Sequence, residues 1–356
     1  MNTGLDELFN DDLNPVLRRM GERPRGAGRD AVLHDEDAET RATVWSTVAG
    51  LGALSCGRQT ELVDIAERMG TALYQSPYAD TVTAVDLLHR LPDLADPALV
   101  DALRDGTRPV AVAVREHGTT NPATPDPLHT DGATVTATRR FVGFAADSSL
   151  LAVIGTADGE TLLALVPTDA PGVRTRRQDD VGRGDLYEVT LDRAPVQGPV
   201  HRITEHYPAV LARARVRLAG YLAGAARGGT ELAAAHLKSR SAFGRPLAHQ
   251  QSLAHRLAGL AAETEAVRAF AQGCARAADE GLDIRLVAAE VLALAAELAR
   301  RAAAESVHLH GAYGMTESCD AQLFYRRAAV DAAWLGTRTD LLTEAGRLLV
   351  GTRTAR

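Results

Sequence analysis

The sequence of 356 residues has few cysteines and lacks any long apolar run. Its three cysteines, Cys56, Cys274 and Cys319, lie far apart, so they form neither a metal-binding spacing nor a disulfide framework. No stretch approaches the roughly 18 consecutive apolar residues that a membrane span needs. The first residues, MNTGLDELFNDDLNPVLRR, are polar and acidic, which argues against a signal peptide. We therefore expect a cytoplasmic protein with reduced thiols and no membrane span.

An excess of basic residues is also missing. Lysine and arginine number 39 against 46 aspartates and glutamates, which gives a net charge of -7. A general nucleic-acid-binding protein would present a basic face, so we expect no nucleic-acid partner. The 46% hydrophobic and 24% charged residues are typical of a globular protein, and the length suffices for two or three domains.

The spacing of apolar residues divides the chain into three parts. Residues 1–108 place them three and four apart, as in TELVDIAERMGTALYQ, which predicts a helical domain. Residues 109–203 alternate in short β-branched runs such as LLAVIG, which predict a small β-domain. Residues 204–356 contain long apolar runs that predict an antiparallel helical bundle. The predicted fold class is therefore multidomain α+β, and the apolar helices indicate a homo- or hetero-oligomer.

Two connections between the long helices carry unusual residues. The first, LKSRSAFGRPLAHQQS, spans residues 237–252, and the second, SVHLHGAYGMTES, spans residues 306–318. A simple helical hairpin needs only polar residues and a glycine. On its residues alone, the first connection could also be a turn with Phe243 in the core and Arg240 in a surface ion pair.

The order of these parts and both connections resemble the acyl-CoA dehydrogenase family. The family pattern R-x-x-F-G-x-x-(L/I)-x-x-x-Q is matched by Arg240, Phe243, Gly244, Leu247 and Gln251. The later pattern Q-x-x-G-G-x-G is matched in part, since Gly311 and Gly314 are kept while His308 and Ala312 replace its glutamine and middle glycine. The resemblance also includes Trp45 with the following LGAL, and the pair Tyr325-Arg326.

This resemblance implies FAD bound at a dimer interface. Arg240 would reach the pyrophosphate with its planar donor groups, and Phe243, followed by Gly244, would face the adenine. Gln251 and the loop from His308 through Gly311 to Gly314 would complete the site from a second subunit. Glycine in that loop lets backbone N–H groups approach the phosphates.

The resemblance further implies α,β-desaturation of an acyl thioester on CoA or an acyl carrier protein. A carboxylate removes the α-proton in that reaction, and the family's two positions for it fall on Leu335 and Ala214, neither of which accepts a proton. Candidate replacements are Asp331, Glu205 and Glu116, although a solvated surface charge is the commoner role of such residues. Arg215 matches a family arginine near the acyl-CoA site and is a candidate for substrate binding.

The β-domain departs from the family at the flavin ring. Arg115, Glu116 and His117 replace its Thr-Glu-Pro, and Phe141-Val142-Gly143 replaces the Trp-(Ile/Val)-Thr strand that backs the isoalloxazine. Phe141 preserves an aromatic wall, whereas Gly143 loses a hydroxyl. The isoalloxazine end of the predicted FAD site is therefore eroded, while the adenine and phosphate end is partly retained.

Three functions are consistent with this asymmetry. The chain could be a dehydrogenase-like flavoprotein with a missing or displaced base, or the non-catalytic subunit of a heteromeric acyl-CoA dehydrogenase. It could also be a flavin-dependent monooxygenase, or run other chemistry on the same fold. No metal is expected, because His308 and His310 lie on different faces of a helix. The run GAARGG at residues 224–229 lacks the Lys-Ser/Thr and the preceding strand of a phosphate loop.

Overall fold

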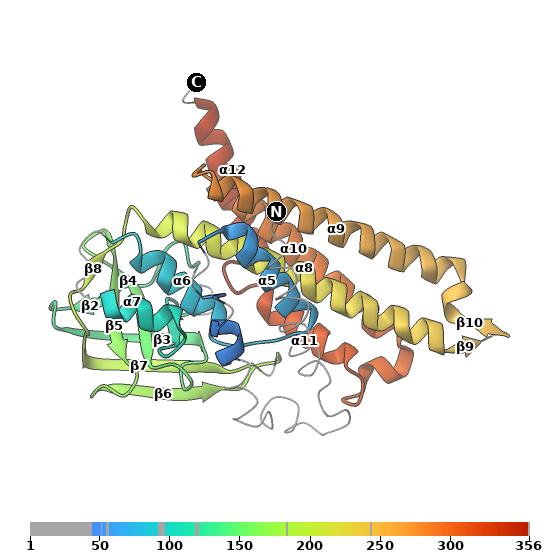
Figure 1. Ribbon diagram of the computed structural model, residues 1–356, viewed down its shortest axis with the longest axis horizontal. Helices are drawn as coiled ribbons and strands as arrows, with labels where there is room; N and C mark the ends of the chain where they lie inside the picture. Colours follow the sequence, from blue (N-terminus) through green and yellow to red (C-terminus); the bar gives the residue numbers. More distant parts are fainter. Residues whose placement is uncertain are drawn as a thin grey trace.

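The computed structural model describes residues 45–50, 52–54, 57–91, 97–117, 121–182, 184–242 and 244–354. In chain order it contains short helices, two β-sheets and a bundle of long helices (Figure 1). This arrangement confirms the predicted α+β fold class. The strands of the two four-stranded sheets run from Val110 to Arg202, and the first long helix begins at Tyr207. The proposed domain bounds at residues 108 and 203 stay a prediction.

The N-terminal helices pack around a small apolar core. After a helical segment at residues 45–50 come α5 (Gln59–Thr71), α6 (Tyr78–Leu88) and α7 (Pro97–Arg104). Trp45 donates a hydrogen bond from Nε1 to the carbonyl oxygen of Gly106 at 2.7 Å. That bond joins the first described helical turn to the end of α7.

The β-region consists of two four-stranded sheets. The first has the order β1-β4-β5-β8 and the second the order β2-β3-β7-β6. Their bounds are β1 Val110–Ala113, β2 His129–Thr130, β3 Thr134–Gly143, β4 Leu150–Ala157, β5 Glu160–Pro167, β6 Val173–Gln178, β7 Leu186–Pro195 and β8 His201–Arg202. β1 pairs with β4 in parallel, and the other neighbouring strands of these two sheets pair antiparallel.

Both faces of the first sheet are buried. On β4, Leu150 and Ala152 face the helices α6 and α7, whereas Leu151 and Val153 face the second sheet. This explains why β4 is apolar throughout instead of alternating with polar residues. The buried Arg139 of β3 also joins the two sheets, since its Nη2 donates to the carbonyl oxygen of Ile154 on β4 at 3.3 Å.

The remainder of the chain is the helical bundle. Its elements are α8 Tyr207–Ser239, the hairpin strands β9 Ser241–Ala242 and β10 Arg245–Pro246, η2 Leu247–His249, α9 Gln251–Asp279, α10 Arg285–Leu309, η3 Gly311–Met315, α11 Ala321–Asp331 and α12 Arg338–Thr354. The β9–β10 hairpin lies at the far end of α8 from the sheets (Figure 1). Among the described residues, no helix combines the length and the apolar character that crossing a bilayer requires.

Glycines allow α5 and α8 to touch backbone to backbone. A Cβ atom on Gly224 would lie 1.9 Å from the carbonyl oxygen of Glu67, and one on Gly70 would lie 1.9 Å from that of Tyr221. Gly220 and Gly228 lie one turn before and after Gly224, on the same face of α8. The run GAARGG is therefore helical and serves as a packing surface for α5.

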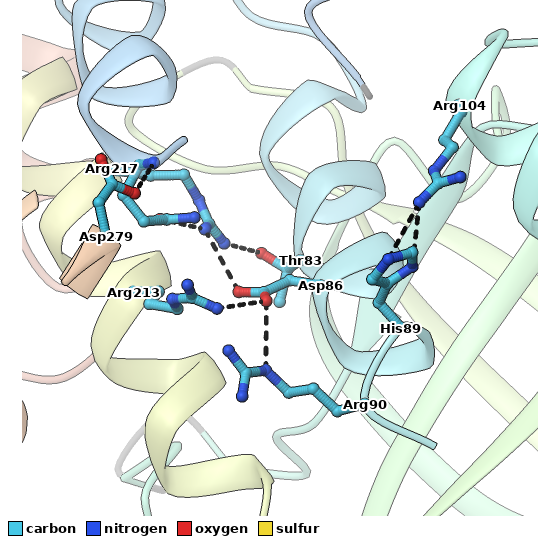
Figure 2. A network of polar contacts seen from close by, with 9 residues as sticks. Thr83, Asp86, His89, Arg90, Arg104, Arg213, Arg217 and Asp279 are labelled. Atoms are coloured by element: carbon cyan, nitrogen blue, oxygen red, sulfur yellow. Dashed lines mark hydrogen bonds and ion pairs between the residues drawn. The ribbon is translucent and has the colours of Figure 1, made fainter. Parts of the chain in front are cut away.

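A cluster of arginines around one carboxylate joins α6 to α8 (Figure 2). Asp86 of α6 accepts a hydrogen bond from Arg213 at 2.9 Å and lies 3.7 Å from the buried Arg217. Arg217 also donates to Thr83 at 3.0 Å and to Gln59 at 2.9 Å. Since a buried cation needs a partner, this cluster fixes α6 against α8.

The close contact of α5 with α8 makes a prediction. Gly224→Ala should lower the free energy of unfolding by about 1–3 kcal/mol, because the new methyl group forces the two backbones apart. Urea denaturation measures the change. Gly273→Ala on α9 is the control, because a Cβ atom there meets nothing within 4 Å. It should leave stability unchanged or raise it by up to about 1 kcal/mol through helix propensity. Equal effects of both substitutions would contradict the packing argument.

Candidate functional site

A cavity opens where the N-terminal helices, the β-region and α8 meet. Its walls come from α5, α6, β1, β3, α8 and the segment that follows α11. It contains about 1440 Å³ of free space, including the open mouth. The walls are mainly apolar, with side chains such as Met69, Val112, Leu211 and Leu218. A cavity of this size and character suits an organic ligand with a substantial apolar part.

Both positions predicted for the family's base line this cavity. Ala214 of α8 and Leu335 after α11 contribute apolar side chains to its wall. The neighbouring Arg215 is buried and donates from Nε to the carbonyl oxygen of Leu335 at 3.1 Å. Its Nη1 lies 2.8 Å from Glu344 of α12. Arg215 therefore fixes the Leu335 segment against α8, and its role in substrate binding stays a prediction.

The three candidate replacement bases lie in different surroundings. Asp331 lines the cavity, but it forms a buried ion pair with Arg327, one turn earlier on α11. Burial raises the pKa of Asp331, and the Arg327 guanidinium opposes that rise. Glu205 is exposed in the turn before α8, and Glu116 is half-buried in the loop after β1. Of the three, the structure brings only Asp331 to the described cavity wall.

Another carboxylate that lines the cavity, Asp80 of α6, is not among the three candidates. Its Oδ2 accepts a hydrogen bond from the backbone N–H of Val112 at 2.9 Å. Burial raises the pKa of Asp80 to about 7, although that hydrogen bond and the nearby Arg115 oppose the rise. In the sequence, Asp80 is only an aspartate beside the apolar face of a short predicted helix. Nothing in that local pattern indicates that β1 and Arg115 lie next to it in the fold.

The strand predicted to back the flavin ring is covered by side chains of this chain. Trp334 packs against Gly143, where a ring carbon would lie 3.3 Å from an added Cβ atom. The Arg115 guanidinium carbon lies 5.5 Å from the ring centre of Phe141 and 5.7 Å from that of Trp334. Phe141 has a φ of 56° at an irregularity of the β3–β7 register, which turns its ring out of the regular strand pattern.

The residues predicted for the adenine and phosphate end lie at the other end of α8. Arg240 ends α8, Gly244 forms the tip of the β9–β10 hairpin with a φ of 76°, and Gln251 begins α9. The side chains of Arg240, Gln251 and His308 are all exposed. Phe243 lies outside the described residues, so its predicted contact with adenine stays a prediction.

The second predicted loop packs next to this hairpin. The ring centre of His236, one turn before Arg240, lies 4.4 Å from the ring centre of His310 and 6.5 Å from that of Tyr313. Apolar side chains from α8, η2, α9 and α10 pack together in a small core next to these rings, and Leu237 and Leu309 are among them. Gly311 has a φ of 63°, and a Cβ atom on Gly314 would lie 2.4 Å from the carbonyl oxygen of Val307. The fold thus brings the two motif loops together.

Comparison with known proteins agrees with this architecture. A sequence profile described as acyl-CoA dehydrogenase, C-terminal domain, matches residues 208–347. The acyl-CoA dehydrogenase FadE34 of Mycobacterium tuberculosis is 29% identical over 346 residues, which cover 90% of this chain and 46% of FadE34. Residues 208–347 therefore belong to the acyl-CoA dehydrogenase C-terminal domain family, and the chain as a whole is similar to acyl-CoA dehydrogenases. It spans about half the length of relatives such as FadE34 and the probable acyl-CoA dehydrogenase YngJ of Bacillus subtilis.

Solved structures of acyl-CoA dehydrogenases share the whole fold. A Tcur3481-Tcur3483 steroid ACAD superposes with a TM-score of 0.84 at 24% identity, covering 98% of this chain and 99% of that one. The ChsE4-ChsE5 complex from Mycobacterium tuberculosis gives a TM-score of 0.78 at 22% identity, with coverage of 97% and 95%. At these identities the likeness establishes the fold, and the site must be judged from this chain's own residues.

The raised pKa of Asp80 predicts a dependence of stability on pH. The folded state holds this proton more tightly than the unfolded state, whose pKa is near 3.8. The resulting stabilisation is therefore fully present below about pH 4 and is lost as the pH rises through about 7. Asp80→Asn keeps an oxygen for the Val112 N–H and removes the charge. As the pH rises from about 4 to about 7, the free energy of unfolding of this variant should increase relative to that of the unmodified chain, by at most about 4 kcal/mol in total.

Urea denaturation at a series of pH values measures this difference. Asp101→Asn is the control, since its side chain on α7 is 77% exposed, and it should change stability by no more than about 0.5 kcal/mol at any pH. A difference between Asp80→Asn and the unmodified chain that does not vary with pH would contradict the assignment.

Proposed function

We propose that this chain is one subunit of a two-chain, FAD-dependent acyl-CoA dehydrogenase that acts on an acyl thioester of CoA or an acyl carrier protein. The observation that carries this proposal is the separation of the two half-sites along α8. The cavity residues on α8 extend to Tyr221, and Arg240 lies at the far end of the same helix. The intervening helix is about 28 Å long, a distance that the short ribityl chain between flavin ring and pyrophosphate does not cover.

The half-site at the hairpin end therefore needs another subunit. Arg240, Gln251 and His308 point into solvent from this chain, as expected of groups that bind a cofactor seated mainly in a neighbour. Arg240 would pair with the pyrophosphate, and the backbone of the Gly311–Gly314 loop would approach it closely. When bound, FAD supplies the acceptor for the hydride that leaves the β-carbon. This chain's part is to hold and orient the nucleotide end.

The second subunit must differ from this one, because the proton acceptor is missing. Two copies of this chain would present only Ala214 and Leu335 at the family's base positions. A different acyl-CoA dehydrogenase-like chain that carries the glutamate would restore the reaction. Two similar structures are named for pairs of components, Tcur3481-Tcur3483 and ChsE4-ChsE5. FadE34 is about twice as long as this chain, which leaves room for a second such unit in one polypeptide.

The test is to produce this chain with a candidate second acyl-CoA dehydrogenase-like chain and to measure FAD and dye reduction with acyl-CoAs. The pair should bind FAD and be active, whereas this chain alone should show no desaturation above background. In the pair, Arg240→Ala should weaken FAD binding about 10- to 100-fold, because it removes a hydrogen-bonded charge from the pyrophosphate.

Arg245→Ala provides the matched control on the same hairpin. Arg245 is exposed like Arg240, but its guanidinium donates to Gln250 of its own chain at 3.2 Å. It should leave FAD binding nearly unchanged. Robust acyl-CoA oxidation by the unpartnered, unmodified chain would sink the proposal and redirect attention to the carboxylates of its own cavity.

A further inference from the structure

Arg115 occupies the part of the cavity in which the family's flavin ring is expected. It follows β1 and lies beside both aromatic rings of this region, 5.5 Å from the centre of Phe141 and 5.7 Å from that of Trp334. Both distances are within the range of a cation–π interaction. Its Nη1 also donates to the carbonyl oxygen of Ala333 at 3.4 Å. Arg115 therefore links the β-region to the segment after α11.

Two titratable groups of the cavity act on the charge of Arg115. Asp80 of α6 and Tyr207 of α8 are the titratable groups that act on it, and burial otherwise lowers the pKa of Arg115. Asp80 is itself held by the N–H of Val112, on the strand that leads to Arg115. The contacts of the guanidinium within this chain are therefore two aromatic faces and the carbonyl oxygen of Ala333.

The geometry leaves no slot for a planar ring between Gly143 and Trp334. A ring between two walls needs about 7 Å, since each face requires an interatomic separation of about 3.5 Å. Trp334 instead reaches within 3.3 Å of the position that a Cβ atom on Gly143 would take. The residues of this chain therefore do not fit the isoalloxazine end of FAD.

We infer that Arg115, held beside Phe141 and Trp334, takes the place of the flavin ring, so that this chain has an apolar ligand cavity without a flavin of its own. The consequence for assembly rests on the proposed function: a pair of unlike chains holds one FAD per pair, in the partner's cavity. The adenine-end loops of this chain are unaffected, because they lie at the other end of α8.

The experiment titrates lumiflavin, the ring without its nucleotide tail, into the isolated chain and follows quenching of its fluorescence. The unmodified chain should show no saturable binding. The double variant Arg115→Ala, Trp334→Ala should bind lumiflavin at least about tenfold more tightly, because the ring site is opened. Arg176→Ala is the control, since Arg176 is 70% exposed on β6 and is not among the residues that line the cavity. It should behave like the unmodified chain.

Two outcomes would overturn the inference. One is saturable lumiflavin binding by the unmodified chain, and the other is a folded double variant that gains no binding. If the double variant does not fold, the flavin content of the unmodified pair decides, with one FAD per pair expected and two contradicting the inference. Failure to find any pair would refute the proposed function alone, because lumiflavin binding is measured on the isolated chain. A pair with two flavins would refute this inference alone.

Discussion

The contact of the α5 backbone with that of α8 is the constraint on which the rest of the molecule depends. Glycines on both helices let the two backbones approach so closely that a methyl group added at Gly70 or Gly224 would overlap a carbonyl oxygen of the other helix. That approach places Ala66 and Met69 of α5 beside the cavity residues of α8. Since Asp86 then binds the arginines of α8, α6 is fixed in turn and carries Asp80 into the same cavity. The shape of the cavity thus follows from helix packing.

Within this frame the two ends of α8 have different characters. At the end near the sheets, charged side chains are buried and have partners within this chain, as in the hydrogen bond from Arg215 to the carbonyl oxygen of Leu335 and the ion pair of Arg327 with Asp331. At the hairpin end, cationic and amide side chains are left in solvent. Buried charge without a partner is costly, whereas exposed charge is not. The first end is therefore complete in one chain, and the second is suited to a neighbour.

Much of this was predictable from the sequence, for physical reasons. Spacing of three and four residues predicted the long helices, and alternation predicted the strands, because those periods reflect which side chains are buried. The family patterns located Ala214 and Leu335, which the structure brings to one cavity. The contact of Trp334 with Gly143 was not predictable, because it joins distant segments and leaves no local pattern. The buried environment of Asp80 was not predictable for the same reason, since it is set by β1 and Arg115.

The length of α8 also bears on how such a chain changes over evolution. A straight helix transmits little between its ends when the side chains at each end contact different neighbours. Substitutions at Ala214 or around Arg115 can then accumulate while selection preserves Arg240 and the glycines of the η3 loop. Under the proposed function, such a subunit can lose its own chemistry and still be retained, because its partner requires the surface that it presents.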